Sequence, residues 1–434
     1  MNPIKAGIFR IQMHRHYDKV MYWGKAISIT GMAQIIVQAV GFACGILVIR
    51  LLPTKEYALY TLANTMLGTM TVLTDGGIST GVMAQGGKVW QDREKLGAVL
   101  ATGLDLRRKF AIGSLIVSTP ILLYLLLHND ASWLTATLIV LSLIPAFYAA
   151  LSDSLLEIVP KLQQSILPLQ KNQVTVGVGR LLLSVLTLFI FPWAFVAILA
   201  SGIPRIYGNI QLRKIAHSFV DNSQQPDPLI RKDILKVVKW VLPGAIYYSL
   251  SGQITIWLIS VVGNSTSVAQ LGAIGRLAML LSLFSVVFST LLIPRFARLK
   301  EDSILLKKRF LSTLGFLVLI CLFIIGLFIV FSSQALGLLG HNYSSLNNEL
   351  ILNIIGSCMG LLTGFIFSLS SSRGWVLNPY FYIAISIISI IVGILVFKVS
   401  TLSGVLLFNI FVTSVQTAMY LFYILFKIKK MNII

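Results

Sequence analysis

The 434-residue sequence has few charged residues, few acids and very few cysteines. Only 12% of its residues are charged, which is about half the share of a typical soluble protein. It contains 15 Asp and Glu against 35 Lys and Arg, and three cysteines with no CxxC pair. Cys44, Cys321 and Cys358 all lie in apolar stretches. We therefore interpret them as packing residues and not as metal or redox ligands.

Sequence signatures of common enzyme classes are also scarce. The chain has no GxxxxGK[ST] loop for nucleotide phosphates and no HExxH pair for zinc. The acids expected on outer loops are only Glu56, Asp130 and Glu349, whereas a membrane polymerase or ligase of lipid-linked sugars needs catalytic groups on sizeable outer loops. We expect neither an enzyme nor a cofactor, and keep such a polymerase or ligase as an alternative.

Long apolar stretches, in contrast, occur along the whole chain. Each is about 20 residues long and matches a bilayer core of about 30 Å. With 56% hydrophobic residues and a mean hydropathy of +0.85, the sequence predicts an all-α integral membrane protein with about 12 transmembrane helices. The predicted spans are at about 26–49, 56–83, 110–127, 133–154, 173–191, 193–212, 240–262, 268–293, 310–331, 350–369, 379–397 and 402–426.

Lysine and arginine fall almost entirely in alternate gaps between these spans. Only Arg50, Lys55 and Lys398 lie in the opposite gaps, and Arg276 lies within the eighth span. Because positively charged loops stay cytoplasmic, both termini are predicted to be inside the cell. The net charge of +20 is then a topology signal combined with attraction to anionic membrane lipids, and we expect no nucleic-acid partner.

The longest polar insert lies near the middle of the chain and predicts two six-helix lobes. Residues 217–239 have the Asp, Asn, Gln and Pro content of a linker, which is expected to be cytoplasmic. Six spans on each side give both lobes the same orientation, as in parallel repeats. The predicted divisions are a basic cytoplasmic N-terminal segment at 1–25, an N-lobe at 26–216, the linker at 217–239, a C-lobe at 240–427 and a cytoplasmic tail at 428–434.

Charged side chains within the spans are the main candidates for a functional site, because each costs about 2.5–3.5 kcal/mol at the bilayer centre. Arg276 and Arg180 lie beside glycines, each about 12 Å from a membrane surface. We expect both to face a wet cavity and bind substrate; the alternative is a structural pair or snorkelling to the interface. Arg50 is either a substrate-binding group or an interfacial anchor. Asp75 is either a proton-coupling carboxylate or the partner of a nearby cation.

Three further ionisable residues near the span ends are given simpler roles. Arg205 is expected at the membrane interface, and Asp153 and Glu157 are expected to form a solvated face. The candidate charges of the spans are thus four arginines, Arg50, Arg180, Arg205 and Arg276, against one aspartate, Asp75. Guanidinium groups bind phosphate through two parallel hydrogen bonds, so this bias favours an anionic substrate in a cationic cavity.

Two stretches resemble a known transporter family. The run Arg50-Leu-Leu-Pro-Thr-Lys-Glu-Tyr-Ala-Leu-Tyr60, followed by Thr74-Asp-Gly-Gly-Ile78, resembles the R-x-L-x-x-x-E-Y-G-x-Y … D-x-G stretch of Wzx-type O-antigen and capsule flippases of the MOP superfamily. The second half has Ile259 to Leu277 followed by Leu292-Ile-Pro-Arg-Phe-Ala-Arg298, which is similar to that family's G-x-Y … R-L … P-x-x-S-R run. The departures are Ala58 for Gly, Leu271-Gly272 for Gly-x-Tyr and Ala297 for Ser.

The resemblance implies a fold and a function. It implies a two-lobed MATE/MOP-like transporter of the bacterial inner membrane that moves undecaprenyl-diphosphate-linked oligosaccharide, a repeat unit of O-antigen or another surface polysaccharide, by alternating access. A polysaccharide polymerase and a chain-length regulator are then the expected protein partners. Since no nucleotide site is present, ion or proton coupling is expected to drive transport. Another MOP carrier, either a drug/cation antiporter or a peptidoglycan-precursor flippase, is the alternative.

Overall fold

The computed structural model describes residues 17–163, 165–281, 302–372 and 377–430, and the separate positions Phe284, Ser285, Phe288, Phe296 and Trp375. The described residues form helices and connecting turns, with no strand among them. Residues 1–16 of the predicted N-terminal segment, residues 431–434 of the tail and, apart from Phe296, the motif at 292–298 lie outside the described residues.

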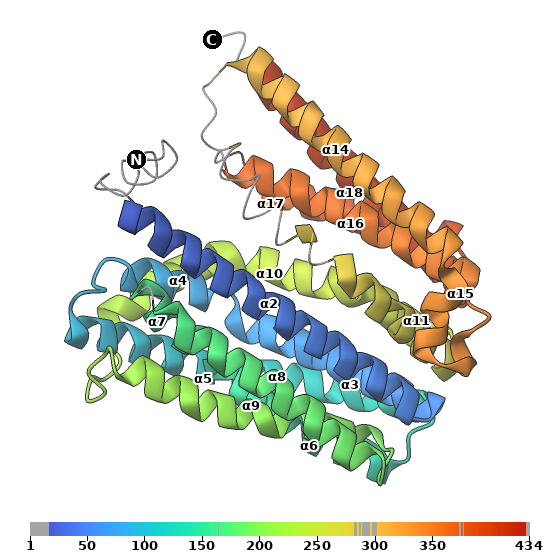
Figure 1. Ribbon diagram of the computed structural model, residues 1–434, viewed down its shortest axis with the longest axis horizontal. Coiled ribbons are helices and arrows are strands. Elements are labelled where there is room, and N and C mark those ends of the chain that lie inside the picture. Colours follow the sequence, from blue (N-terminus) through green and yellow to red (C-terminus); the bar gives the residue numbers. More distant parts are fainter. Residues whose placement is uncertain are drawn as a thin grey trace, which may run out of the picture.

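The first half of the chain forms a bundle of elongated helices that run roughly side by side (Figure 1). Ala and Gly at many helix contacts allow close packing, as is usual for helices in lipid. The helices are α2 (Tyr17–Leu51), α3 (Thr54–Asp75), α4 (Ile78–Gly86), α5 (Arg93–His128), α6 (Trp133–Leu156), α7 (Ile158–Leu162), α8 (Ile166–Leu188) and α9 (Ala194–His217).

The second half is also helical. Its elements are α10 (Pro228–Val262), α11 (Ser265–Ala278), the short 3-10 turn η1 (Met279–Leu281), α14 (Ser303–Val330), α15 (Ser332–Leu339), η2 (His341–Tyr343), α16 (Asn347–Ser372), α17 (Pro379–Val396) and α18 (Leu402–Lys430). α16 packs against α14 and α18, while α10 contacts both α17 and α18 of its own half and α3, α4 and α5 of the first half.

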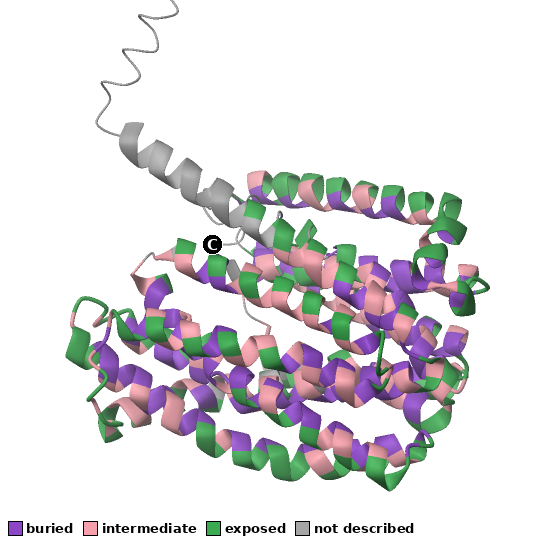
Figure 2. Cartoon of the chain, turned by 60° about the horizontal axis from the view of Figure 1, so that its bottom comes forward, coloured by how far each residue is buried: buried purple, intermediate pink, exposed green. Residues whose placement is uncertain are grey.

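Every predicted span overlaps one of these helices. Among the described residues, five helices are long and apolar enough to cross a membrane: Arg93–His128, Trp133–Leu162, Ser303–Val330, Asn347–Ser370 and Leu402–Lys430. Only 17% of the apolar window of Ser303–Val330 is buried inside the protein, so this helix presents an apolar outer surface that suits lipid. Figure 2 shows exposed residues on the outer faces of the helices and buried residues between them. The number of spans and their orientation in the membrane stay predictions.

The span predicted at 56–83 is wrong as a single helix, because the chain breaks between α3 and α4. Gly76 and Gly77 have φ angles of 48° and 93°, in the left-handed region that favours glycine. A Cβ on Gly77 would also lie 2.6 Å from the Cβ of Val241 in α10. The two glycines therefore let the chain turn where α10 crosses it.

The connection between the halves is shorter than the predicted linker at 217–239. α9 ends at His217, and α10 already begins at Pro228. The Asp227 carboxylate accepts hydrogen bonds from the backbone N–H groups of Leu229 and Ile230, and proline suits the first helical position. Some of the polar residues that favour a loop therefore cap or begin a helix, and α10 continues from Pro228 into the predicted seventh span.

Candidate functional site

Two stacked tyrosines of α3 lie at the centre of the candidate site. Tyr57 and Tyr60 are one helical turn apart, and their ring centroids are separated by 6.0 Å with an interplanar angle of 26°. Both side chains are buried. α11 of the second half packs closely on α3, since a Cβ on Gly272 would lie only 2.6 Å from Thr61 Oγ1. The tyrosine pair is thus placed where the two halves of the chain meet.

Arg276, in the last turn of α11, lies against helices of the first half. A Cβ on Gly45 of α2 would be 3.3 Å from Arg276 Cδ, so the arginine side chain passes α2 at a glycine. Its guanidinium interacts electrostatically with Tyr57 and Tyr60, and Nη1 lies 3.7 Å from Met279 Sδ. The buried Tyr57 hydroxyl nevertheless has no hydrogen bond of normal geometry.

Arg180 reaches the same tyrosine pair from α8. Its Nη2 donates to Tyr60 Oη at 3.5 Å, and its buried Nε has no hydrogen-bond partner. Gly177 and Gly179 allow α8 to lie near α2 and α9, because their added Cβ atoms would meet Val40 at 3.5 Å and Pro204 at 3.4 Å. The structure therefore brings two of the predicted site residues together around Tyr60.

The two guanidinium groups are not neutralised by an acid. No ion pair with Asp or Glu involves Arg180 or Arg276 in the part of the chain that the structure describes. Arg180 instead lies within electrostatic range of Arg276, and both lie near Cys44 and Tyr60. Leaving two like charges close together and partly buried is unfavourable, and a bound anion would relieve it.

A cavity of about 810 Å³ opens beside this site and is lined by residues of the first half together with Val241 of α10. Arg180 lines it, whereas Arg276 is not among its described lining residues. The lining contains the same number of acids as arginines, so the expectation of a uniformly cationic cavity needs correction: the unneutralised positive charge is confined to the tyrosine site. The charged lining residues are Asp75, Asp153, Glu157, Arg107, Arg180 and Arg205.

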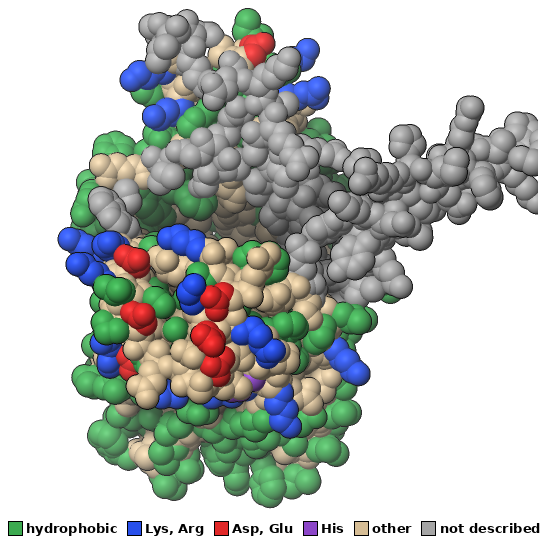
Figure 3. Space-filling view, turned by 90° about the vertical axis from the view of Figure 1, so that its left-hand side faces the viewer, with side chains coloured by type: hydrophobic (Ala, Val, Ile, Leu, Met, Phe, Trp, Pro, Cys, Tyr) green, Lys and Arg blue, Asp and Glu red, His purple; other side chains and the backbone are tan. Residues whose placement is uncertain are grey.

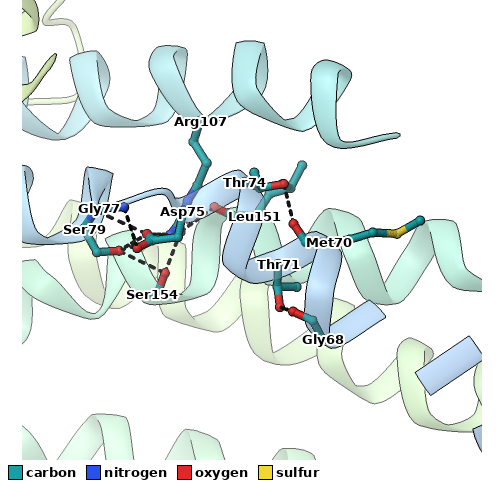
Figure 4. A network of polar contacts seen from close by, with 10 residues as sticks. All are labelled: Gly68, Met70, Thr71, Thr74, Asp75, Gly77, Ser79, Arg107, Leu151 and Ser154. Atoms are coloured by element: carbon teal, nitrogen blue, oxygen red, sulfur yellow. Dashed lines mark hydrogen bonds and ion pairs between the residues drawn. The ribbon is translucent and has the colours of Figure 1, made fainter. Parts of the chain in front are cut away.

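Asp75, which is partly exposed, forms an ion pair with the buried Arg107 of α5 (Figure 4). Its Oδ1 also accepts from Ser79 Oγ at 2.5 Å and from the Ser79 backbone N–H at 3.2 Å. Arg107 Nη1 donates to Ser154 Oγ at 2.5 Å and to the Leu151 carbonyl at 2.8 Å. Asp75 is thus the partner of a nearby cation, and its carboxylate lines the cavity, whereas Tyr57 and Tyr60 are not among the described lining residues.

Arg107 is the residue that the sequence analysis missed. It was counted with the loop cations, because the third span was predicted to begin only at about residue 110. α5 in fact begins at Arg93, and only 3% of Arg107 is exposed. Asp92 caps this helix by accepting from the backbone N–H groups of Glu94 and Lys95, a signal that could have placed its start correctly.

A second ion pair joins Arg205 to Asp153, and the interfacial position expected for Arg205 stays a prediction. Arg205 Nε lies 3.0 Å from Asp153 Oδ2, and Asn209 donates to Asp153 Oδ1 at 2.6 Å. Glu157, the other acid expected on a solvated face, accepts from Lys161 at 2.6 Å and from Gln173 at 3.3 Å. These acids line the cavity because α6 and α9 pack closely against each other.

The segment Gly77-Ile-Ser-Thr-Gly81 has the GxSxG spacing of a serine-hydrolase elbow. The Ser79 hydroxyl, however, donates to Asp75 and accepts from Arg107 Nη2 at 3.1 Å. None of its described hydrogen bonds is to a histidine, so nothing here activates it as a nucleophile. The serine belongs to the ion-pair network.

Arg50 is not brought to the tyrosine site. Its Nε donates to the Leu338 carbonyl and its Nη2 to the Gly337 carbonyl, both at 2.7 Å. These carbonyls lie in the last turn of α15, where helix carbonyls lack partners within the helix. Arg50 therefore links α2 of the first half to α15 of the second half.

Comparisons with known proteins identify the fold. No family model matches the sequence, and no curated protein matches it either. An inward-facing multidrug resistance MATE transporter of the MOP superfamily superposes with a TM-score of 0.74, 14% identity and coverage of 94% of this chain and 99% of that one. The lipid II flippase MurJ, in an inward closed conformation, superposes with a TM-score of 0.72, 14% identity and coverage of 92% and 87%.

The chain has the fold of MOP-superfamily transporters. With its long apolar helices, this fold indicates a multi-pass membrane protein. An outward-facing MATE structure gives a lower TM-score of 0.65, at 15% identity and coverage of 94% and 97%.

Proposed function

We propose that the chain is a flippase that carries undecaprenyl-diphosphate-linked oligosaccharide across the bacterial inner membrane, for O-antigen or another surface polysaccharide. One observation carries the proposal: two unneutralised guanidinium groups, Arg180 from the first half and Arg276 from the second, meet at the Tyr57–Tyr60 pair. A diphosphate supplies oxygens that accept charge-assisted hydrogen bonds from both arginines. Tyrosine rings offer an apolar and hydrogen-bonding surface for a sugar or a lipid chain.

Placing one arginine on each half also suits alternating access. An anion held by both guanidinium groups is bound best when α8 and α11 are close together, so its binding free energy depends on the conformation. In this proposal the halves rock around the site, and the coupling ion or proton supplies the energy. Asp75 can serve as the coupling group only if its ion pair with Arg107 opens during the cycle. A polymerase and a chain-length regulator stay proposed partners.

A drug or cation antiporter is the second candidate, since three acids line the cavity. All three are ion-paired, Asp75 with Arg107, Asp153 with Arg205 and Glu157 with Lys161, which reduces their attraction for a cation. A peptidoglycan-precursor flippase would use the same anion site. The two candidates differ in the phenotype of a deletion strain, because loss of a peptidoglycan-precursor flippase stops growth, whereas loss of a surface-glycan flippase removes the glycan.

The test is surface-glycan immunoblotting of a deletion strain that carries plasmid variants at matched membrane expression. Arg276→Ala should remove most of the glycan, and Arg276→Lys should restore only part, because an ammonium group keeps the charge but loses the planar fork. Lys171→Ala is the matched control, since it removes an exposed cation from α8 and should leave the glycan at the wild-type level. Wild-type glycan from Arg276→Ala would refute the proposed site.

A further inference from the structure

We propose that a groove between the ends of α14 and α18 binds an anionic glycerophospholipid of the surrounding bilayer, with the phosphate against lysines and an acyl chain along the apolar wall. The groove has a volume of about 690 Å³ and combines cations with apolar side chains. It is lined by Ser303, Ile304, Lys307, Lys308 and Leu311 of α14 and by Phe422, Leu425, Phe426, Ile428 and Lys429 of α18.

The positive charge of the groove comes from Lys307, Lys308 and Lys429. All three side chains are exposed, and none of the ion pairs in the described chain involves them. The nearby Asp302 carboxylate caps α14 by accepting from the backbone N–H groups of Ile304 and Leu305. Figure 3 shows blue side chains around apolar green surface at the top of the molecule, where α14 and α18 end.

Part of the apolar wall is also exposed. Phe422, Phe426 and Ile304 are 73%, 65% and 76% exposed. Because other helices leave most of these side chains uncovered, a lipid acyl chain can pack against them. A basic groove with an apolar wall between membrane helices is typical of sites for anionic lipid headgroups. A neutral lipid would use the apolar wall and leave the lysines without an anion.

Helix lengths place the groove at headgroup level. α14 has 28 residues and α18 has 29. Helices of these lengths extend for about 42 Å, whereas the hydrocarbon core is about 30 Å thick. The lysines lie in the first two turns of α14 and the last turn of α18, and long lysine side chains reach toward the interface. The phosphate of a bilayer lipid lies at the same level.

The groove is separate from the proposed transport site. Its walls belong to α14 and α18, whereas the tyrosine site is built by α2, α3, α8 and α11. No residue is shared between the groove and the cavity beside Arg180. A lipid in the groove therefore binds on the lipid-facing surface of the protein and not in the transport site. Its binding can be measured without measuring transport.

The test is native mass spectrometry of the full chain with phosphatidylglycerol and phosphatidylcholine of identical acyl chains. The wild-type chain should retain phosphatidylglycerol in preference to phosphatidylcholine. The triple variant Lys307→Gln, Lys308→Gln and Lys429→Gln should lose about tenfold or more of that preference, given the contribution of each lysine near an anionic headgroup. Equal retention of the two lipids by the wild-type chain would overturn the proposal.

A matched control separates the groove from net charge. The triple variant Lys171→Gln, Lys214→Gln and Lys232→Gln removes three exposed lysines elsewhere and should keep the wild-type preference. An equal loss in both triple variants would show a nonspecific charge effect and overturn the proposal.

A second arm tests the acyl chain. Excess glycerol 1-phosphate should fail to displace phosphatidylglycerol, because it lacks the chain that uses the apolar wall. Displacement at comparable concentrations would show a phosphate site without a lipid role, and would also overturn the proposal. Circular dichroism of each variant confirms that it is folded, so a loss of preference is not a loss of structure.

Discussion

Replacing Asp75 by asparagine should destabilise the protein by leaving the Arg107 guanidinium unneutralised. The Arg107 side chain is only 4% exposed, whereas that of Asp75 is 31% exposed. Arg107 keeps its hydrogen bonds to Ser154 Oγ and the Leu151 carbonyl in the variant, but it loses the carboxylate that balances its charge. The damage therefore arises on the arginine, which has little access to water.

The size of the effect follows from this difference in exposure. Removing one partner of a fully buried ion pair costs about 3–5 kcal/mol. Because the carboxylate is partly exposed and the asparagine oxygen still accepts a hydrogen bond, we expect a loss of about 2–3 kcal/mol in the free energy of unfolding. The apparent melting temperature in detergent should fall by about 5 °C for a chain of this size.

Asp105→Asn is a matched control for the melting measurement. The Asp105 side chain is 30% exposed, as much as Asp75, but its partners Lys109 and Arg231 are 56% and 38% exposed. Water can solvate these cations, so the control should lose less than about 1 kcal/mol. Equal melting temperatures for the two single variants would refute the argument from the buried arginine.

The double variant Asp75→Asn with Arg107→Gln completes a thermodynamic cycle. Removing the arginine as well eliminates the uncompensated charge, so the double variant should be more stable than the sum of the two single losses predicts. Additive losses would show that the two residues stabilise the protein independently, contrary to the ion pair in Figure 4.

Three further predictions concern the ends of the molecule. Arg50→Ala removes two hydrogen bonds that link α2 to α15, so the population in which these helices are apart should rise about 5–30-fold. Spin-label distances between the two helices measure this population, and an unchanged distance distribution would contradict a stabilising role for the Arg50 link. Reporter fusions at Ser223 and Asn342 should report opposite membrane sides, and the same side for both would contradict the twelve-span topology. Hydrogen bonds from Lys95 lower the pKa of Asp92. The Asp92 cap therefore stabilises α5 fully above the ordinary carboxyl pKa, and this stabilisation is lost as the pH falls through the lowered pKa. Asp92→Ala should speed amide exchange in the first turn of α5 at neutral pH and make no difference in strong acid.

The positions of the helices could be predicted from the sequence because apolar length and charge segregation are properties of single segments. α6 begins at Trp133, as the predicted fourth span does. Helix ends that depend on other helices were predicted less well. The break at Gly76–Gly77 reflects the approach of Val241, and the early start of α5 reflects packing of its first turns against the rest of the bundle.

The pairing of charges could not be predicted, since it depends on which helices are neighbours. Asp75 and Arg107 are 32 residues apart, and Asp153 and Arg205 are 52 apart. An excess of arginine over acid within the predicted spans favoured a cationic cavity. This count left out the cation of Arg107 and the acid of Asp153. Their place in the cavity wall depends on how α3, α5, α6 and α9 pack together.

The distribution of paired and unpaired arginines favours the Tyr57–Tyr60 site over the ion pairs of the cavity wall as the proposed centre of transport. Arg107 and Arg205 form their ion pairs entirely within the first half, so these contacts can persist while the two halves move as units. Arg180 and Arg276 belong to different halves, and no described acid neutralises them. An anion bound there is sensitive to the relative position of the halves, whereas an ion bound to the paired groups is not. In the proposed cycle, coupling between substrate and conformation therefore resides at Tyr57 and Tyr60.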